Sequence, residues 1–184
     1  LFCSCSLVAC SSDETAGGST EATNGFAERD SMVVAAHIEG FIQKGPFVEN
    51  SPVKVWELHA DGTRTGRFFE TQTDEKGGFS IDCDSLVSKY VDIESEGSFR
   101  SEIPGQNYGD PVTLRAFGIV STTSSINVNV FTQLQYNRVA HLVEKDSLSI
   151  TMAKDSAKGE VERTLFGKTS DVPFEKLNIF GSTE

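Results

Sequence analysis

The chain has 184 residues, of which 38% are hydrophobic and 23% charged, and its net charge is −11. This length suits one domain or one and a half, and the hydrophobic fraction is enough for a packed core. The acidity argues against a nucleic-acid partner, because nothing in the composition offsets repulsion by phosphates. Three of the four cysteines (Cys3, Cys5 and Cys10) lie in the first ten residues, which argues against a disulfide scaffold.

The first ten residues, LFCSCSLVAC, are apolar or small and carry no charged side chain. They are too few to span a bilayer, which needs about 20 apolar residues. They fit the second half of a secretory signal peptide, with residues 1–9 as its remnant. Leu7, Val8, Ala9 and Cys10 resemble the lipobox of bacterial lipoproteins. That resemblance implies cleavage before Cys10, whose thiol would carry diacylglycerol and whose new amine would be acylated, for example with palmitate.

The stretch that follows is predicted to be a flexible tether, and we assign residues 10–31 to the lipidated cysteine and this tether. Ser11–Gly25 contains no aromatic and no large aliphatic side chain, so it cannot bury enough surface to offset its ordering entropy. Two or more acyl chains make membrane anchoring stable. By resemblance to lipoprotein sorting rules, Ser11 implies the outer membrane of the cell envelope. The alternative interpretation is an apolar N-terminus with a chance cysteine.

Residues 32–118 show a hydrophobic period of two, interrupted by turn residues about every ten positions, which is typical of short antiparallel strands. The pattern predicts a mainly β fold, an antiparallel seven-stranded β-sandwich of the prealbumin or immunoglobulin type. The absence of helical repeats between the strands argues against parallel βαβ units. The predicted strands include Val34–Ile38, Val53–Leu58, Arg67–Thr73, Phe79–Cys83, Lys89–Glu94, Phe99–Ile103 and Pro111–Phe117.

Several motifs in this region resemble one family. They are GFIQKGPF at residues 40–47, DEKGGF at residues 74–79 and INVNV at residues 126–130. In this order they resemble bacterial surface lipoproteins that open with a sandwich similar to the carboxypeptidase regulatory-like, or prealbumin-like, domain. The resemblance covers most of residues 40–167. It implies an accessory fold that carries no catalytic zinc ligands.

Residues 126–184 are predicted to be a helical region that continues beyond residue 184. Asn129 is placed to cap a helix over Val130–Lys145, and Ser149 or Thr151 to cap a second one that stops before Gly167. The two helices would form a hairpin, followed by a short helix within Asp171–Phe180 with Pro173 in its first turn. The expected apolar stripes are Phe131, Leu134, Arg138 and Leu142, widened by Val139 and Val143, and then Ile150, Ala153, Ala157, Val161 and Leu165.

The sequence offers no catalytic, metal or cofactor signature. His37, His59 and His141 show no metal-ligand spacing, and Cys83 between two aspartates suits a buried small side chain better than a reactive thiol. Ser51 and Lys54 match S-x-x-K, but in a strand they point to opposite faces. We therefore predict no catalytic residue, no metal and no cofactor.

Two features could still belong to a binding site. Asp92, Glu94 and Glu96 alternate along one strand and could hold Ca²⁺, although a solvated sheet face is the favoured interpretation. Sugar rings stack on exposed aromatic side chains, and Trp56, Tyr90 and Tyr108 are the candidates, although core packing is the default for a ring in a strand.

The sequence thus favours a non-enzymatic cell-envelope lipoprotein whose tethered sandwich is an accessory, scaffolding or binding module at the bacterial surface. Its partners would be the membrane, through the lipid anchor, and a polysaccharide or an envelope protein. The alternative is the accessory domain of a larger secreted or surface hydrolase, with a catalytic part beyond residue 184. Sequence beyond that residue would discriminate between the two.

Overall fold

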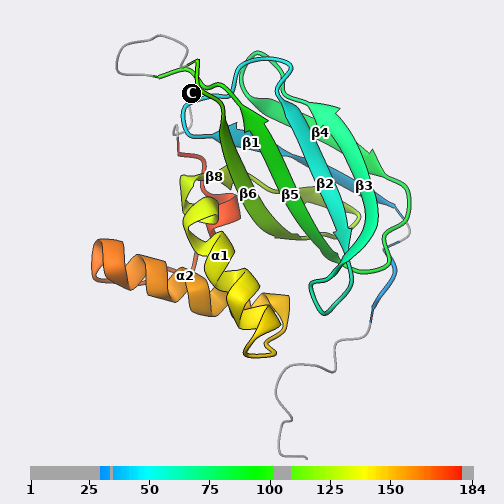
Figure 1. The fold of residues 1–184 in the computed structure, drawn as a ribbon, viewed down its shortest axis with the longest axis vertical. Helices are drawn as coiled ribbons and strands as arrows, with labels where there is room; N and C mark the ends of the chain where they lie inside the picture. Colours follow the sequence, from blue (N-terminus) through cyan, green and yellow to red (C-terminus); the bar gives the residue numbers. More distant parts are fainter. Residues whose placement is uncertain (1–29, 34, 102–108, 180–184) are drawn as a thin grey trace, which may run out of the picture.

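The computed structural model describes residues 30–33, 35–101 and 109–179 (Figure 1). The predicted signal remnant, the lipobox with Cys10, the tether up to residue 29 and Tyr108 lie outside these residues. Within them, none of the helices is long and apolar enough to span a lipid bilayer.

Two β-sheets and two helices make up the described fold, so the predicted mainly β architecture with a C-terminal helical part is confirmed (Figure 1). One sheet has the order β3-β2-β5-β6 and is antiparallel throughout. In the other, β1 pairs with β4 on one side and with β7 and β8 on the other. The strands are β1 (Ala36–Gln43), β2 (Pro52–Leu58), β3 (Arg64–Gln72), β4 (Gly78–Cys83), β5 (Tyr90–Gly97), β6 (Val112–Ile119), β7 (Thr123–Ser125) and β8 (Val128–Asn129).

The strand count and the strand directions differ from the prediction. The described residues form eight strands, and both β7 and β8 run parallel to β1. These two strands have three and two residues, too few for a period of two to be visible in the sequence. The predicted strand at Phe99–Ile103 was wrong in its described part, where the strand pairing of Phe99 is an isolated bridge to Phe47.

The described residues form two hydrophobic cores, one on each side of the β3-β2-β5-β6 sheet. The first core lies between the two sheets and includes Ile38, Val55 and Ile93, which are completely buried. The second core lies between the other face of that sheet and the helices, and it includes Tyr90 and Val139. Each fully buried aliphatic side chain contributes about 1.5–3 kcal/mol, so both faces of this sheet contribute to stability.

The two helices begin and end where the sequence predicted. α1 (Val130–Glu144) starts at a capping box, in which the Asn129 side chain accepts from the Thr132 backbone and the Thr132 hydroxyl accepts from the Asn129 backbone. α2 (Ile150–Phe166) is capped by Ser149 and ends at Gly167, whose φ of 69° is in the left-handed region. Such a residue at the end of a helix is most easily a glycine.

The buried faces of the helices differ from the predicted stripes. The prediction was wrong for Leu134 and Leu165, which are 55% and 53% exposed. The side of α1 that faces the sheet contains more polar residues than the predicted apolar stripe. Thr132 is buried because it belongs to the capping box, and Tyr136 is buried because its hydroxyl donates a hydrogen bond to Asp92 of β5. The buried residues of the two helices are Thr132, Gln135, Tyr136, Val139, Leu142 and Val143, then Ile150, Ala153, Lys154, Ala157 and Glu162.

The chain after α2 returns to the sheets through a short 3-10 helix, η1 (Phe174–Lys176), which lies within the segment where the sequence predicted a short helix and has Pro173 directly before it. Two asparagines, one directly before β8 and one at its end, hold this segment. The Asn129 amide donates to the Phe174 carbonyl, and the Asn127 backbone N–H donates to the Glu175 carbonyl. The segment therefore packs beside β8, as Figure 1 shows.

Candidate functional site

The outer face of the β3-β2-β5-β6 sheet carries two rows of side chains that cross all four strands. Side chains alternate along each strand, so the residues between those of the inner core point outward. The first row is charged and alternates in sign: Glu70, Lys54, Glu94 and Arg115. The second row is largely aromatic: Phe68, Trp56, Asp92 and Phe117. We call these two rows, with Arg64, the outer face.

A β-bulge in β3 brings Arg64 onto this face. Trp56 pairs with Phe68 and Leu58 with Arg64, so three β3 residues lie opposite one β2 residue. Gly66 at the centre of the bulge has a φ of 91°, which an L side chain rarely adopts. The bulge directs the Arg64 guanidinium over the Trp56 ring, with 4.2 Å between Cζ and the ring centroid.

Asp92 is the centre of the polar contacts on the outer face. Its side chain is buried, with 2% of the residue exposed, and its Oδ2 accepts from Arg64 Nη2 at 2.5 Å and from the Tyr136 hydroxyl at 2.9 Å. Burial, followed by the charge of Asp92, raises the pKa of Tyr136 to about 12. The phenol therefore stays protonated and acts as a donor to the carboxylate.

Four buried polar atoms on the outer face have no hydrogen-bond partner among the described residues. Two of them, Glu94 Oε2 and Arg115 Nε, belong to side chains that form an ion pair with each other. The other two are Trp56 Nε1, a donor, and Asp92 Oδ1, an acceptor, and these two residues are direct cross-strand partners. Buried polar atoms are paired in the large majority of cases. A hydroxyl group both accepts and donates, so it is the kind of group that would satisfy this pair.

α1 covers one half of the outer face and leaves the other half open. The Tyr136 ring stacks on Phe117 at 4.8 Å, and the Gln133 side chain accepts from the Arg115 backbone N–H at 2.7 Å. On the β2 and β3 side, Phe68 is 43% exposed and lies 4.7 Å from Trp56. Lys54 Nζ lies 5.0 Å from the Phe68 ring and 3.1 Å from Glu70 Oε1. The open half therefore combines aromatic rings with side chains of both charges.

A cleft of about 460 Å³ extends from the covered half toward the β2–β3 turn. Its apolar wall includes Phe117 and Val143, and its rim carries Asp61 and Glu144. The Asp61 carboxylate accepts from the Thr63 hydroxyl and backbone N–H, and these two hydrogen bonds lower its pKa. The turn is therefore held firmly at the entrance of the cleft.

The three aromatic residues that were predicted as ligand-binding candidates lie in different places. Trp56 lies half-buried on the outer face. Tyr90 is 1% exposed in the second core, and its hydroxyl lies 3.1 Å from Thr151 Oγ1, so its ring packs the helices rather than facing a ligand. Tyr108 lies outside the described residues.

Two of the three predicted carboxylates form ion pairs with arginines, whereas Glu96 is exposed to solvent. Asp92 binds Arg64, and Glu94 forms ion pairs with Arg115 and, at 3.7 Å, with Arg64. No group of three or more potential metal ligands occurs among the described residues. The interpretation of this strand as a solvated sheet face was wrong for Asp92, which is buried.

The thiol, the hydroxyl and two of the imidazole side chains that the sequence singled out are buried or bound by hydrogen bonds within the fold. Cys83 is buried, and burial, followed by the charge of Asp82, raises the pKa of its thiol to about 11. The Ser51 hydroxyl donates to the Val48 carbonyl at 2.7 Å, whereas Lys54 lies on the outer face. His37 and His59 each lie 2.7 Å from an aspartate oxygen.

The sequence pointed to Trp56 but missed its surroundings. Phe68 stands opposite Trp56 only in the observed register, and a shift of one residue would turn it to the other face. Arg64 depends on the bulge at Gly66, and Tyr136 comes from a helix 44 residues after Asp92. A local signal was Gly66, directly before the predicted strand Arg67–Thr73 and inside the observed β3, since a glycine in a strand indicates a bulge or a close backbone approach.

No family model and no curated protein matches the sequence. Among solved structures, the chain is similar to a proposed carbohydrate binding protein from Pseudomonas aeruginosa, with 15% identity and a TM-score of 0.35 over 54% of this chain and 91% of that chain. It is also similar to a 3-chlorocatechol 1,2-dioxygenase from Rhodococcus opacus 1CP, with 7% identity and a TM-score of 0.29 over 58% and 62% of the two chains. A 9R-lipoxygenase from Cyanothece PCC8801 gives 10% identity and a TM-score of 0.29 over 74% of this chain and 25% of that chain. At these scores the likenesses assign neither a family nor an activity.

Proposed function

We propose that the chain is a non-enzymatic cell-envelope lipoprotein whose sandwich is a binding module, with the open half of the outer face as its ligand-binding surface. The observation that carries this proposal is the pairing of exposed Phe68 and half-buried Trp56 beside two buried polar atoms that lack a partner. Exposed aromatic side chains with a few fixed polar groups are typical of ligand sites.

The ligand class that fits this surface is a polysaccharide. Flat rings suit the apolar faces of sugars, and sugar hydroxyls both donate and accept hydrogen bonds. The charges of the outer face also cancel, since three basic residues (Lys54, Arg64 and Arg115) stand beside three acidic ones (Glu70, Asp92 and Glu94). A neutral surface with many donors and acceptors favours a neutral, hydroxyl-rich ligand over a strongly charged one.

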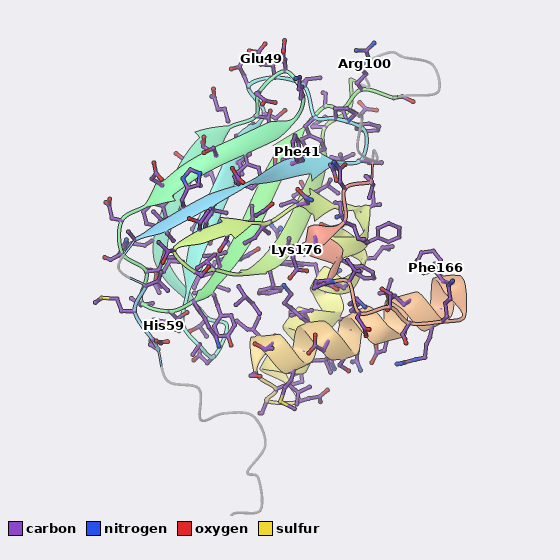
Figure 2. The ribbon with its side chains drawn as sticks, turned by 180° about the vertical axis from the view of Figure 1, so that it is seen from behind. Phe41, Glu49, His59, Arg100, Phe166 and Lys176 are labelled. Carbon is purple, nitrogen blue, oxygen red and sulfur yellow. The ribbon has the colours of Figure 1, made fainter. Side chains whose placement is uncertain are left out.

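The test is binding of the 184-residue chain to bacterial envelope polysaccharides, measured by affinity electrophoresis in gels that contain each polysaccharide. We expect Trp56→Ala to weaken binding about tenfold or more. Phe68→Ala should weaken binding as well, and Phe41→Ala is its matched control, because Phe41 (38%) is about as exposed as Phe68 (43%) but lies on β1 in the other sheet (Figure 2). Equal binding by Phe68→Ala and Phe41→Ala, or no retardation by any polysaccharide, would refute the proposed surface.

The anchor is tested separately from the binding surface. Cells that express the protein are labelled with radioactive palmitate, and the Cys10→Ala variant is compared with the unchanged protein. The proposal expects label in the unchanged chain and none in the variant, because the lipid chemistry requires the thiol of Cys10. Equal labelling of both chains would disprove the anchor.

A further inference from the structure

The α1–α2 hairpin presents an apolar groove to the outside of the fold, away from the outer face. The groove has a volume of about 300 Å³ and lies between the two helices. Leu134 from α1 and Val161 and Leu165 from α2 line it, and both leucines are more than half exposed. These are the residues that the sequence pattern had assigned to the buried stripes.

The groove is open because α2 extends beyond the sandwich. Its buried apolar residues, Ile150, Ala153 and Ala157, all lie in the first half of the helix. The second half projects away from the sheets and ends at Phe166, which is exposed and contacts Phe131 of α1 (Figures 1 and 2). The helix pattern is therefore amphipathic along its full length, but the fold covers only part of it.

The charge distribution indicates what kind of surface fits this groove. The whole chain has a net charge of −11, so two copies repel each other over most of their surfaces. Residues 130–167 are neutral, with five basic residues (Arg138, Lys145, Lys154, Lys158 and Arg163) and five acidic ones (Glu144, Asp146, Asp155, Glu160 and Glu162). The hairpin is thus a part of the molecule where a second copy meets no net repulsion.

The rim of the groove is also complementary to itself. Arg138 on α1 and Glu160 on α2 form a bidentate ion pair, with Nε–Oε2 at 2.8 Å and Nη2–Oε1 at 3.0 Å. A two-fold axis brings the same patch of two copies together. In such a symmetric contact, Arg138 of each copy can lie near Glu160 of the other copy, while the leucines of both copies meet in the centre.

We propose that the hairpin groove is a dimerisation surface, in which two copies pack α1 and α2 against α1 and α2 as a four-helix interface. Leu134 and Leu165 of each copy fill the groove of the other. Buried apolar anchors surrounded by a charged rim are the usual arrangement of such contacts. The two sandwiches stay apart, so their acidic surfaces do not approach each other closely. This proposal does not depend on the ligand or on the lipid anchor.

The experiment is sedimentation equilibrium of the 184-residue chain over a hundredfold concentration range, with a reducing agent so that thiols do not crosslink the copies. The unchanged chain should show a concentration-dependent monomer–dimer equilibrium. Leu134→Glu and Leu165→Glu should each weaken association about 30-fold or more. Both leucines are exposed in the single chain, so the helical circular dichroism signal should stay unchanged. The urea midpoint should also stay unchanged at concentrations where the unchanged chain is monomeric, because dimerisation adds to the stability of the unchanged chain only at higher concentrations.

Met152→Glu is the matched control, because Met152 is 50% exposed on α2 but does not line the groove. This variant should dimerise as the unchanged chain does. A chain that is monomeric at all concentrations overturns the proposal and leaves the groove to a helix of another protein. A dimer that persists in both leucine variants overturns it as well, because the contact must then lie elsewhere.

Discussion

The buried ion pair between α2 and η1 gives the sharpest stability prediction. Lys154 and Glu175 are both buried, and Lys154 Nζ donates to Glu175 Oε1 and, at 2.7 Å, to the Phe117 carbonyl of β6. Desolvation lowers the pKa of Lys154, and the carboxylate of Glu175 opposes that shift. The glutamate is therefore what keeps a charged lysine tolerable at this position.

Removing only the glutamate should be costly. Glu175→Ala leaves a buried ammonium whose remaining described partner is a carbonyl, and the free energy of unfolding should fall by about 3–5 kcal/mol. Replacing both residues, as in Lys154→Met with Glu175→Leu, removes the charge together with its partner. The double variant should stay within about 1.5 kcal/mol of the unchanged chain. Urea denaturation followed by circular dichroism measures all three chains.

The change of stability with pH in the Glu175→Ala variant tests whether the loss comes from the charge of Lys154. A lysine whose pKa is lower in the folded than in the unfolded state binds fewer protons when folded, so stability rises with pH between the two pKa values. Without Glu175, the pKa of Lys154 falls further below its usual 10.5. The deficit of the variant should therefore shrink as the pH rises from 7 toward 10. A deficit below about 1 kcal/mol at pH 7, or one that does not shrink, would refute the reasoning.

Three further predictions concern single residues. Gly40→Ala should prevent folding or cost several kcal/mol (about 3 or more), because its Cβ would lie 1.9 Å from the Ile126 carbonyl oxygen; thermal unfolding measures the loss. Asn129→Ala should lower the free energy of unfolding by about 2–3 kcal/mol, since it removes both the α1 cap and the hydrogen bond to the Phe174 carbonyl; Asn129→Asp, which keeps the cap alone, should recover part of that loss. The Cys83 thiol, with its pKa raised to about 11, should react with a disulfide reagent at pH 8 only after unfolding, in a chain whose other cysteines are serines; rapid labelling of the folded chain would contradict its burial.

Local signals located much of the fold. The caps of both helices are set by side chains within three residues of the helix start, so Asn129 and Ser149 could be identified from the sequence. The period of two found most strands, because one face of each packs into a core. The short parallel strands β7 and β8 could not be found in this way. Their pairing with β1 depends on contacts with residues more than 80 positions earlier in the chain.

The candidate site was predictable only in part, because it consists of cross-strand neighbours. Trp56 stands out in the sequence as the single tryptophan, but its partners depend on register, on the bulge at Gly66 and on the position of α1. Alternation alone assigns Tyr90 and Trp56 to the same face of the sheet. Whether either ring reaches solvent is decided by which part of that face the helices cover.

That division of the outer face also connects the two proposals. α1 covers the β6 side through Tyr136 and Gln133, and by doing so it fixes the acceptor Asp92 next to the open side. Leu134 lies on the outward side of the same helix, because the opposite side of α1 packs against β5 and β6. The polysaccharide surface and the dimer groove are thus consequences of one helix orientation. Since they lie on opposite sides of α1, a ligand on the outer face and a second copy on the hairpin can be bound together, and Trp56→Ala should leave dimerisation unchanged.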